Sequence, residues 1–306
     1  MSHSEFTRRQ FLGTSAAVAG AALVGPLIGQ ASAQAAVKRT ATDIVTLGHT
    51  GLKLSRLGIG TGLDNGRQML PLGQDGFSAL VKHAWDRGIR YVDTCERYVT
   101  FPWIADAIKP LPREQLFLLS KVSGTPADVM AAIDDQRKKC NTDYFDALLI
   151  HSQTVAGWTA MDTWKHVMDV FNEAKEKKWI KAKGISCHNL PALTDAVATD
   201  FNEVHLVRVN PMGKYVDGPS GRGYTASETF PVEPVLEQIK AIKAKGRGLI
   251  GMKIFGNGLF TDPADREKSL KFAMSNPNID AVVIGFKTIA ELDEGIDRMN
   301  RVLAEG

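Results

Sequence analysis

The chain has 306 residues, of which 44% are hydrophobic and 23% are charged, and its formal net charge is +3. This composition is typical of a globular protein with a sizeable core, and it excludes disordered and collagen-like chains. The basic residues are scattered rather than gathered in a stripe, which argues against a nucleic-acid groove or an anionic membrane surface as the main partner. Small molecules are therefore the expected ligands.

The first 33 residues have the pattern of an export signal. The pair Arg8 and Arg9 precedes a weakly apolar run rich in alanine and glycine, and the small residues at 31–33 offer a site for signal peptidase. The pattern resembles a twin-arginine (Tat) signal peptide. Cleavage is expected because glycines and a proline interrupt the run, which suits a removed segment better than a membrane span. An uncleaved membrane anchor is the alternative.

A Tat signal implies that the Tat machinery exports the protein already folded, often with a cofactor inserted first, to the periplasm or another extracytoplasmic space. The destination is oxidising, yet the sequence predicts no disulfide framework. Its three cysteines, Cys95, Cys140 and Cys187, are an odd number and lack the spacing of a metal finger. The core is therefore expected to be stable without covalent cross-links.

After residue 33, short aliphatic runs alternate with helix-length amphipathic segments. The eight strand candidates are Leu57 to Gly60, Arg90 to Asp93, Leu116 to Leu119, Phe145 to Ile150, Ala182 to Ile185, Val204 to Val209, Gly248 to Met252 and Ala281 to Ile284. The helix candidates are Gly76 to Arg87, Pro126 to Lys139, Ala160 to Lys178, Leu190 to Ala198, Val232 to Lys245, Asp265 to Ser275 and Ala290 to Leu303. No change of composition marks a second domain, so residues 34–306 are expected to form one domain. The pattern predicts a (β/α)8 TIM barrel, with a doubly wound sheet as the alternative.

One connection is longer than an ordinary loop between a strand and a helix. The segment from Asn210 to Pro231 is rich in glycine, proline and serine and follows the sixth strand candidate. In a barrel this position lies on the catalytic face. A lid over a ligand is the favoured interpretation, and a disordered insertion is the alternative.

Four polar residues follow the ends of three consecutive strand candidates. Asp93 and Tyr98 follow the second, Lys121 the third and His151 the fourth. In a barrel these positions share one mouth, although each residue alone is as well explained by a cap, a half-buried aromatic or a buried histidine. Taken together they predict an active site.

The four residue types suit proton transfer. A tyrosine has an ordinary pKa of about 10, and an adjacent ammonium such as that of Lys121 stabilises the phenolate of Tyr98. Asp93 is expected to hold the ammonium in place, because an unpaired buried cation is costly. His151 is expected to donate a hydrogen bond to the substrate oxygen on which negative charge develops. The sequence therefore predicts Tyr98 as the proton donor.

Several segments in this order resemble the aldo-keto reductase superfamily, and they cover nearly all of residues 34–306. The matching segments are LGHTGLKLSRLGIGTG (an opening β-hairpin and first strand), GIRYVDTCERY, LFLLSKV, TDYFDALLIHS, KAKGISCHN and VIGFKTIAELDE. The resemblance places Asp93, Tyr98, Lys121 and His151 at the family's catalytic positions. It implies an N-terminal hairpin, hydride transfer between a nicotinamide cofactor and an aldehyde, ketone or alcohol, and NADP(H) in preference to NAD(H).

The resemblance also implies residues that contact the nicotinamide. Ser186 matches a hydroxyl that family members direct at the carboxamide. Cys187 stands where asparagine is frequent, Leu206 replaces a glutamine, and Lys253 falls where a tyrosine often contacts the pyridine ring. These departures leave the binding pose open.

A phosphate site is expected where the last helix begins. The backbone amides of Phe286, Lys287 and Thr288 and the charge of Lys287 suit a phosphate group. However, Glu291 falls near the family's usual arginine for the adenosine 2′-phosphate. A carboxylate there repels a phosphate, so the preference for NADP(H) is open to test.

Two other functions remain alternatives. Cys95, Cys187, His151 and His188 all lie near predicted strand ends, which would suit a zinc or other soft-metal site, although their spacing matches no known ligand pattern and no metal residue is assigned. The other alternative is an exported, non-catalytic binding or scaffold protein that has the barrel but no turnover.

Overall fold

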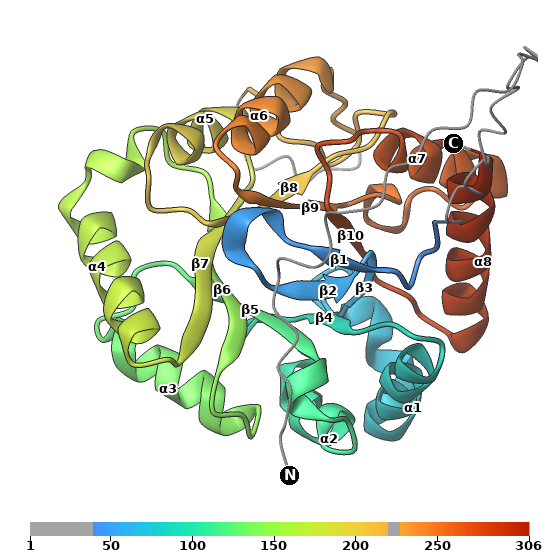
Figure 1. The fold of residues 1–306 in the computed structure, drawn as a ribbon, viewed down its shortest axis with the longest axis horizontal. Helices are drawn as coiled ribbons and strands as arrows, with labels where there is room; N and C mark the ends of the chain where they lie inside the picture. Colours follow the sequence, from blue (N-terminus) through green and yellow to red (C-terminus); the bar gives the residue numbers. More distant parts are fainter. Residues whose placement is uncertain (1–38, 220–226, 306) are drawn as a thin grey trace, which may run out of the picture. The chain divides into compact units, whose positions relative to one another are not determined.

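Eight parallel strands close into a barrel in the computed structural model, which describes residues 39–219 and 227–305 (Figure 1). The strands are hydrogen-bonded in the order β10-β3-β4-β5-β6-β7-β8-β9, which is chain order around a closed ring. Helices surround this ring in Figure 1. The prediction of a (β/α)8 barrel is confirmed, and the doubly wound sheet is wrong. The predicted signal segment lies outside the described residues.

All eight barrel strands coincide with predicted runs. They are β3 (Leu57–Gly60), β4 (Tyr91–Asp93), β5 (Phe117–Ser123), β6 (Phe145–Gln153), β7 (Ile180–Cys187), β8 (Val204–Arg208), β9 (Gly248–Met252) and β10 (Ala281–Ile284). The strands β5, β6 and β7 run past the ends of their apolar cores. Their polar extensions place hydroxyl, imidazole and thiol groups at the carboxyl end of the barrel.

The helices outside the barrel follow the predicted segments closely. They are α1 (Gly73–Asp86), α2 (Ile104–Ile108), α3 (Val129–Lys139), α4 (Asp162–Glu176), α5 (Leu190–Ala198), α6 (Glu233–Ala244), α7 (Pro263–Met274) and α8 (Ile289–Glu305). Short 3-10 turns occur at Gly48–Thr50, Arg67–Leu72, Phe101–Trp103, Arg113–Gln115, Trp158–Ala160 and Gly256–Gly258. Only α2 was not predicted. Its five residues are too few to show a helical period. Within the described ranges, no helix combines the length and apolar character needed to cross a bilayer.

The N-terminal end of the barrel is closed by an antiparallel hairpin of β1 (Ile44–Thr46) and β2 (Lys53–Ser55), drawn in blue in Figure 1. Leu47 and Leu54 of this hairpin are fully buried and belong to the same hydrophobic cluster as the side chains inside the barrel. The turn at Gly48 needs a glycine, because φ is +50° and a Cβ would lie 2.4 Å from the carbonyl carbon of Arg247. Ligands therefore enter from the opposite end.

The interior of the barrel is packed below that open end. The rings of Tyr91 and Phe117 meet edge to face with centroids 5.2 Å apart. Gly58 makes room for this pair, since a Cβ there would lie 2.0 Å from the Tyr91 ring. A packed interior is usual for this fold and confines chemistry to the rim.

The long connection after β8 is tied to the barrel over its first half. Arg208 donates from Nε to Asp217 at 2.7 Å, and both side chains are fully buried. Burial raises the pKa of Asp217, and the guanidinium opposes that rise. Phe230, near the far end of the connection, donates its amide to the carbonyl of Gly213. The middle of the predicted lid lies outside the described residues.

Candidate active site

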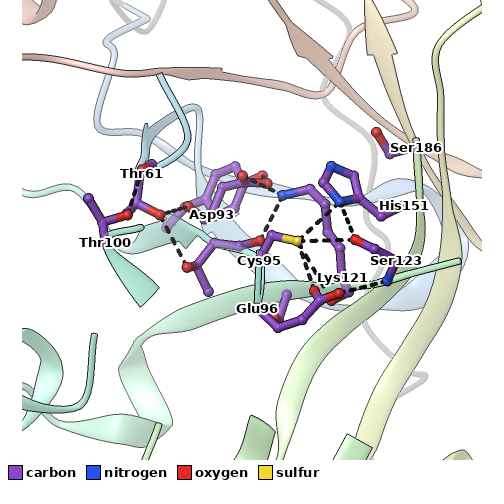
Figure 2. Close-up of polar contacts among 12 residues, drawn as sticks. Thr61, Asp93, Cys95, Glu96, Thr100, Lys121, Ser123, His151 and Ser186 are labelled. Carbon is purple, nitrogen blue, oxygen red and sulfur yellow. Dashed lines mark hydrogen bonds and ion pairs between the residues drawn. The ribbon is translucent and has the colours of Figure 1, made fainter. Parts of the chain in front are cut away.

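A buried ion pair lies at the rim where β4 and β5 end. Lys121 Nζ is 2.6 Å from Asp93 Oδ1 and also donates to the carbonyl of Thr94 at 2.8 Å (Figure 2). The hydroxyl of Tyr91 lies 3.3 Å from the second carboxylate oxygen. The side chains of Lys121 and Asp93 are only 1% and 6% exposed. Each buried charge is therefore stabilised by the opposite charge of its partner.

Burial raises the pKa of Asp93 above its usual value, and the Lys121 ammonium with its hydrogen bond limits that rise. Separating the pair would leave each charge buried without a partner, which costs free energy, so the two side chains stay together. This arrangement fixes an ammonium at the base of the site, as the sequence predicted.

The ring of Tyr98 lies near both this ammonium and the imidazole of His151. Lys121 Nζ lies 5.1 Å from the centroid of the Tyr98 ring. The rings of Tyr98 and His151 meet edge to face, with centroids 5.8 Å apart. The structure therefore brings together all four residues that the sequence selected, from the ends of β4, β5 and β6.

Gly62 sets the position of the Tyr98 ring. A Cβ at residue 62 would lie 2.3 Å from Cζ of Tyr98 and 2.8 Å from its hydroxyl oxygen. Only a residue without a side chain leaves the phenol where it is.

We expect Gly62→Ala to displace the Tyr98 phenol and to lower turnover by about 10²-fold, the typical cost of a misplacement near 1 Å. Carbonyl reduction rates measured beside the wild type check this result. Gly76→Ala in α1 is the matched control, because its Cβ meets only Leu72 at an ordinary 3.4 Å. Equal turnover in Gly62→Ala and Gly76→Ala would contradict the role of Gly62.

His151 is held on one edge of its ring. Nδ1 lies 2.8 Å from Ser123 Oγ and 3.0 Å from Cys95 Sγ, and the other ring nitrogen points away from both (Figure 2). Burial, and then Lys121 and other nearby cations, hold the pKa of His151 well below its usual value, so the ring is neutral near pH 7. Sequence reasoning missed Ser123 and assigned Cys95 only to the metal alternative. Their positions beside Lys121 and Asp93 in the sequence were the available signal.

A cavity of about 300 Å³ opens beside these residues, a size at the lower end of small-molecule sites. It extends from Asp93 and Tyr98 at one end to Lys287 and Glu291 at the start of α8. The remaining lining residues come from β3, β9 and β10, from the segments that follow these strands, and from α7 and α8. They include Gly60, Leu63, Met252, Lys253, Asn257, Arg266, Phe286 and Glu294. An elongated ligand in this cavity can therefore contact Asp93 and Tyr98 at one end and Glu291 of α8 at the other.

Three of the six residues expected to contact a cofactor line this cavity: Lys253, Phe286 and Lys287. The other three do not. Ser186 is buried with its hydroxyl 3.5 Å from Nε2 of His188, and Cys187 is buried in the hydrophobic cluster between barrel and helices. Thr288 accepts the amide of Glu291 through Oγ1 and caps α8.

The start of α8 is already occupied by a side chain of the protein. Glu291 accepts the backbone amide of Lys287 at 2.7 Å, and its other oxygen lies 3.3 Å from Lys287 Nζ. The backbone amide and the ammonium of Lys287, which were predicted to bind a phosphate, thus both contact the Glu291 carboxylate. Cations that remain on the cavity wall are Lys253 and Arg266, the latter paired with Glu294 at 2.8 Å.

Lys253 donates to Asn257 Oδ1 at 2.7 Å and adopts a left-handed backbone conformation with φ of +58°. Burial, and then the charges of Arg208 and Lys121, lower its pKa to about 8. Its charge is therefore full well below pH 8 and is lost as the pH rises through that value.

We expect binding of an anionic nucleotide to weaken above pH 8 by up to about tenfold per pH unit, because one proton on Lys253 is linked to binding. Equilibrium titration of NADPH between pH 6.5 and 9.5 measures this slope. Lys253→Met should bind more weakly at pH 7 and lose the slope. The same slope in both proteins would assign the titration to another group.

The proposed metal site has no ligand set in the part of the chain that the structure describes. Residues 39–219 and 227–305 contain no group of three or more His, Cys, Asp or Glu side chains arranged to hold a metal. Cys95 and His151 are in contact, but burial raises the pKa of Cys95 and disfavours the thiolate that a metal requires.

Comparison with known families identifies the barrel. Residues 56–305 match the model of the aldo/keto reductase family, and residues 5–25 match the twin-arginine translocation pathway signal sequence. The chain belongs to the aldo/keto reductase family. Its N-terminus carries a Tat signal sequence, as the arginine pair predicted.

Several characterised proteins are similar to part of this aldo/keto reductase. It is 32% identical over 102 residues to an NADPH-dependent alpha-keto amide reductase of Saccharomyces cerevisiae, covering 29% of this chain and 32% of that protein. It is 28% identical over 125 residues to methylglyoxal reductase DkgB of Salmonella typhi, covering 39% and 46%. The chain thus spans about a third to a half of these curated relatives.

Solved aldo-keto reductases share the fold over almost the whole barrel. A putative aldo-keto reductase from Pseudomonas aeruginosa superposes with a TM-score of 0.69 at 20% identity, covering 88% of this chain and 99% of the other. An aldo-keto reductase from Klebsiella pneumoniae in complex with NADPH superposes with a TM-score of 0.65 at 14% identity, covering 85% and 90%. At these identities the comparison establishes the fold.

Proposed function

We propose that this aldo/keto reductase is an exported oxidoreductase that interconverts an aldehyde or ketone with its alcohol, using a nicotinamide dinucleotide. The single observation that carries the proposal is the convergence of Asp93, Tyr98, Lys121 and His151 beside a cavity long enough to reach α8. Family membership supplies the reaction class. The four residues supply the groups that the reaction needs.

In the proposed reaction the bound nicotinamide supplies or accepts the hydride. Tyr98 gives its phenolic proton to the substrate oxygen during reduction and recovers it in the reverse direction. The ammonium of Lys121 stabilises the phenolate left behind, and Asp93 holds that ammonium at 2.6 Å. His151 contacts the same oxygen as a neutral imidazole.

The cavity wall fits a dinucleotide in part. Lys253 and Arg266 offer charge to phosphate groups, and Phe286 offers an apolar surface. Glu291 and Glu294 line the far end, where a further phosphate on the adenosine ribose would meet negative charge. The family relationship favours NADP(H), and these two carboxylates oppose it, so both dinucleotides belong in the test.

The proposed location is the periplasm or another extracytoplasmic space, reached through the Tat machinery, with residues 1–33 removed. Tat export carries a folded protein, so the nucleotide can be bound before export. Mass spectrometry of protein isolated from the cell envelope reports both the mature N-terminus and any dinucleotide bound to it. A small-molecule carbonyl or alcohol is the expected partner.

The direct test is binding followed by turnover. The purified protein is titrated with NADPH and NADH by fluorescence, and oxidation of each is then followed with methylglyoxal and a panel of aldehydes and ketones. Tight binding with oxidation that depends on the carbonyl supports the proposal. Binding of a nucleotide without turnover, or no binding of either nucleotide, would overturn the proposal and favour the non-catalytic alternative.

A further inference from the structure

The ammonium of Lys253 lines the cavity without a carboxylate partner. Its Nζ donates to the neutral amide oxygen of Asn257 at 2.7 Å, and no ion pair of Lys253 occurs among the residues that the structure describes. By contrast, Lys287 on the same cavity wall lies 3.3 Å from a carboxylate oxygen of Glu291. The charge of Lys253 is therefore available to act on a ligand.

The backbone fixes the position from which Lys253 reaches the cavity. Its φ of +58° is a left-handed conformation that costs a lysine free energy and persists only where the surroundings hold it. The carbonyl of Lys253 accepts the amide of Gly256 at 2.9 Å and the side-chain amide of Asn210 at 3.1 Å. Asn210 is itself fully buried at the start of the long connection. The strained residue is thus held by contacts on both sides.

Other charged and titratable groups surround Lys253, and none of them neutralises it. The carboxylates already have partners, since Asp93 lies 2.6 Å from Lys121 and Asp64 lies 3.8 Å from Arg67. Burial, and then nearby cations, hold the pKa of both surrounding histidines well below its usual value, so both rings are neutral near pH 7. The groups that interact electrostatically with Lys253 are Asp64, Asp93, Lys121, His151, His188 and Arg208. Lys253 therefore adds a positive charge that no carboxylate offsets.

Such a charge distinguishes the two forms of a nicotinamide dinucleotide. The oxidised ring is positively charged and the reduced ring is neutral, whereas the phosphates are the same in both forms. Because Tyr98 protonates the substrate oxygen in the proposed function, the ring must lie beside the carbon that carries this oxygen, at the end of the cavity lined by Asp93 and Tyr98. The charge of Lys253 reaches this end, since it is one of those that limit the rise in the pKa of Asp93. Like charges repel strongly in a partly buried site.

We propose that the ammonium of Lys253 makes this protein select the reduced nicotinamide dinucleotide over the oxidised one. Lys253 is then a specificity-determining residue for the redox state of the nucleotide. The proposal rests on the proposed function, which places the nicotinamide in this cavity. It also gives the reaction a preferred direction, because the oxidised nucleotide formed by carbonyl reduction is repelled and leaves, and the resting protein holds the reduced form.

The proton on Lys253 limits the size of this selection. With a pKa of about 8, removing that proton at pH 7 weakens binding by about tenfold, so the oxidised form is penalised by at most that factor. The charge is full well below pH 8 and is lost above it. At pH 7 we therefore expect the ratio of the oxidised to the reduced dissociation constant to be about tenfold larger in the wild type than in Lys253→Met. At pH 9.5 the two ratios should converge.

Dissociation constants test the proposal without turnover. The purified protein is titrated by calorimetry with NADPH and NADP⁺, and with NADH and NAD⁺, at pH 7 and pH 9.5. Lys253→Arg should keep a high ratio at both pH values, because a guanidinium stays charged. Lys287→Met is the matched control. It removes a cation of the same cavity that is already paired with Glu291, so both forms should change equally and their ratio should stay as in the wild type.

A wild-type ratio equal to that of Lys253→Met at pH 7, or a ratio that falls as far in Lys287→Met, would overturn the proposal. If Lys253→Met does not fold, the wild type still decides, because a ratio that is the same at pH 7 and pH 9.5 contradicts a role for this ammonium. Binding of neither form would overturn the proposed function as well. Carbonyl reduction by a protein that binds both forms alike would overturn this proposal alone.

Discussion

Tyr98→Phe is expected to keep the fold and the affinity for the nucleotide, and to lower carbonyl reduction by about 10²- to 10⁴-fold, the usual contribution of a positioned proton donor. The phenyl ring retains its contacts with Lys121 Nζ and the His151 ring, which involve the ring face and edge. Only the hydroxyl is lost, and with it the proton for the substrate oxygen. Steady-state kinetics with a reactive aldehyde measure the loss.

The same preparation provides the controls for Tyr98→Phe. Nucleotide dissociation constants and the thermal midpoint of the variant should match those of the wild type. Tyr215 lies on the long connection after β8. Its variant Tyr215→Phe is the control for removing a tyrosine hydroxyl elsewhere in the protein. A Tyr98→Phe variant that turns over as fast as the wild type would remove Tyr98 from the chemistry.

The barrel could be predicted because its strands differ from its helices in local composition. The runs that became β3, β9 and β10 are short, apolar and bounded by turns, and the structure reproduces their predicted limits. The carboxyl end of β6 was not predicted, although its first residue, Phe145, was. Its last residues, His151 to Gln153, are polar, and a strand lengthened by pairing with its neighbours leaves no apolar signal.

The four rim residues could be chosen because the fold places strand ends together whatever their separation in sequence. The contacts behind them could not. Ser123 meets His151 because β5 and β6 pair these two residues directly, and the register between strands is not written in either strand alone. Likewise, Thr288 and Glu291 hydrogen-bond to backbone amides at the start of α8, where a phosphate was expected. This competition cannot be inferred from the sequence, because it depends on where the folded chain places the two side chains.

Loss of Lys121 should have the largest effect on stability. Lys121→Met leaves the Asp93 carboxylate buried with the Tyr91 hydroxyl at 3.3 Å and without its ammonium. Removing one partner of a buried ion pair typically costs about 3–5 kcal/mol. We therefore expect a loss of that order in the free energy of unfolding at pH 7, measured by urea titration, together with loss of turnover.

The pH dependence of this loss identifies its cause. Burial already raises the pKa of Asp93 from 3.8, and without the ammonium the rise is larger. A carboxyl with a raised pKa in the folded state destabilises the fold as the pH rises above its unfolded value, until the folded pKa is passed. The deficit of Lys121→Met should therefore shrink on acidification toward pH 4. Adding Asp93→Asn should recover much of it at pH 7, because the amide is neutral. A deficit that is constant with pH, or unaffected by Asp93→Asn, would mean that the lysine stabilises the barrel by packing rather than by neutralising Asp93.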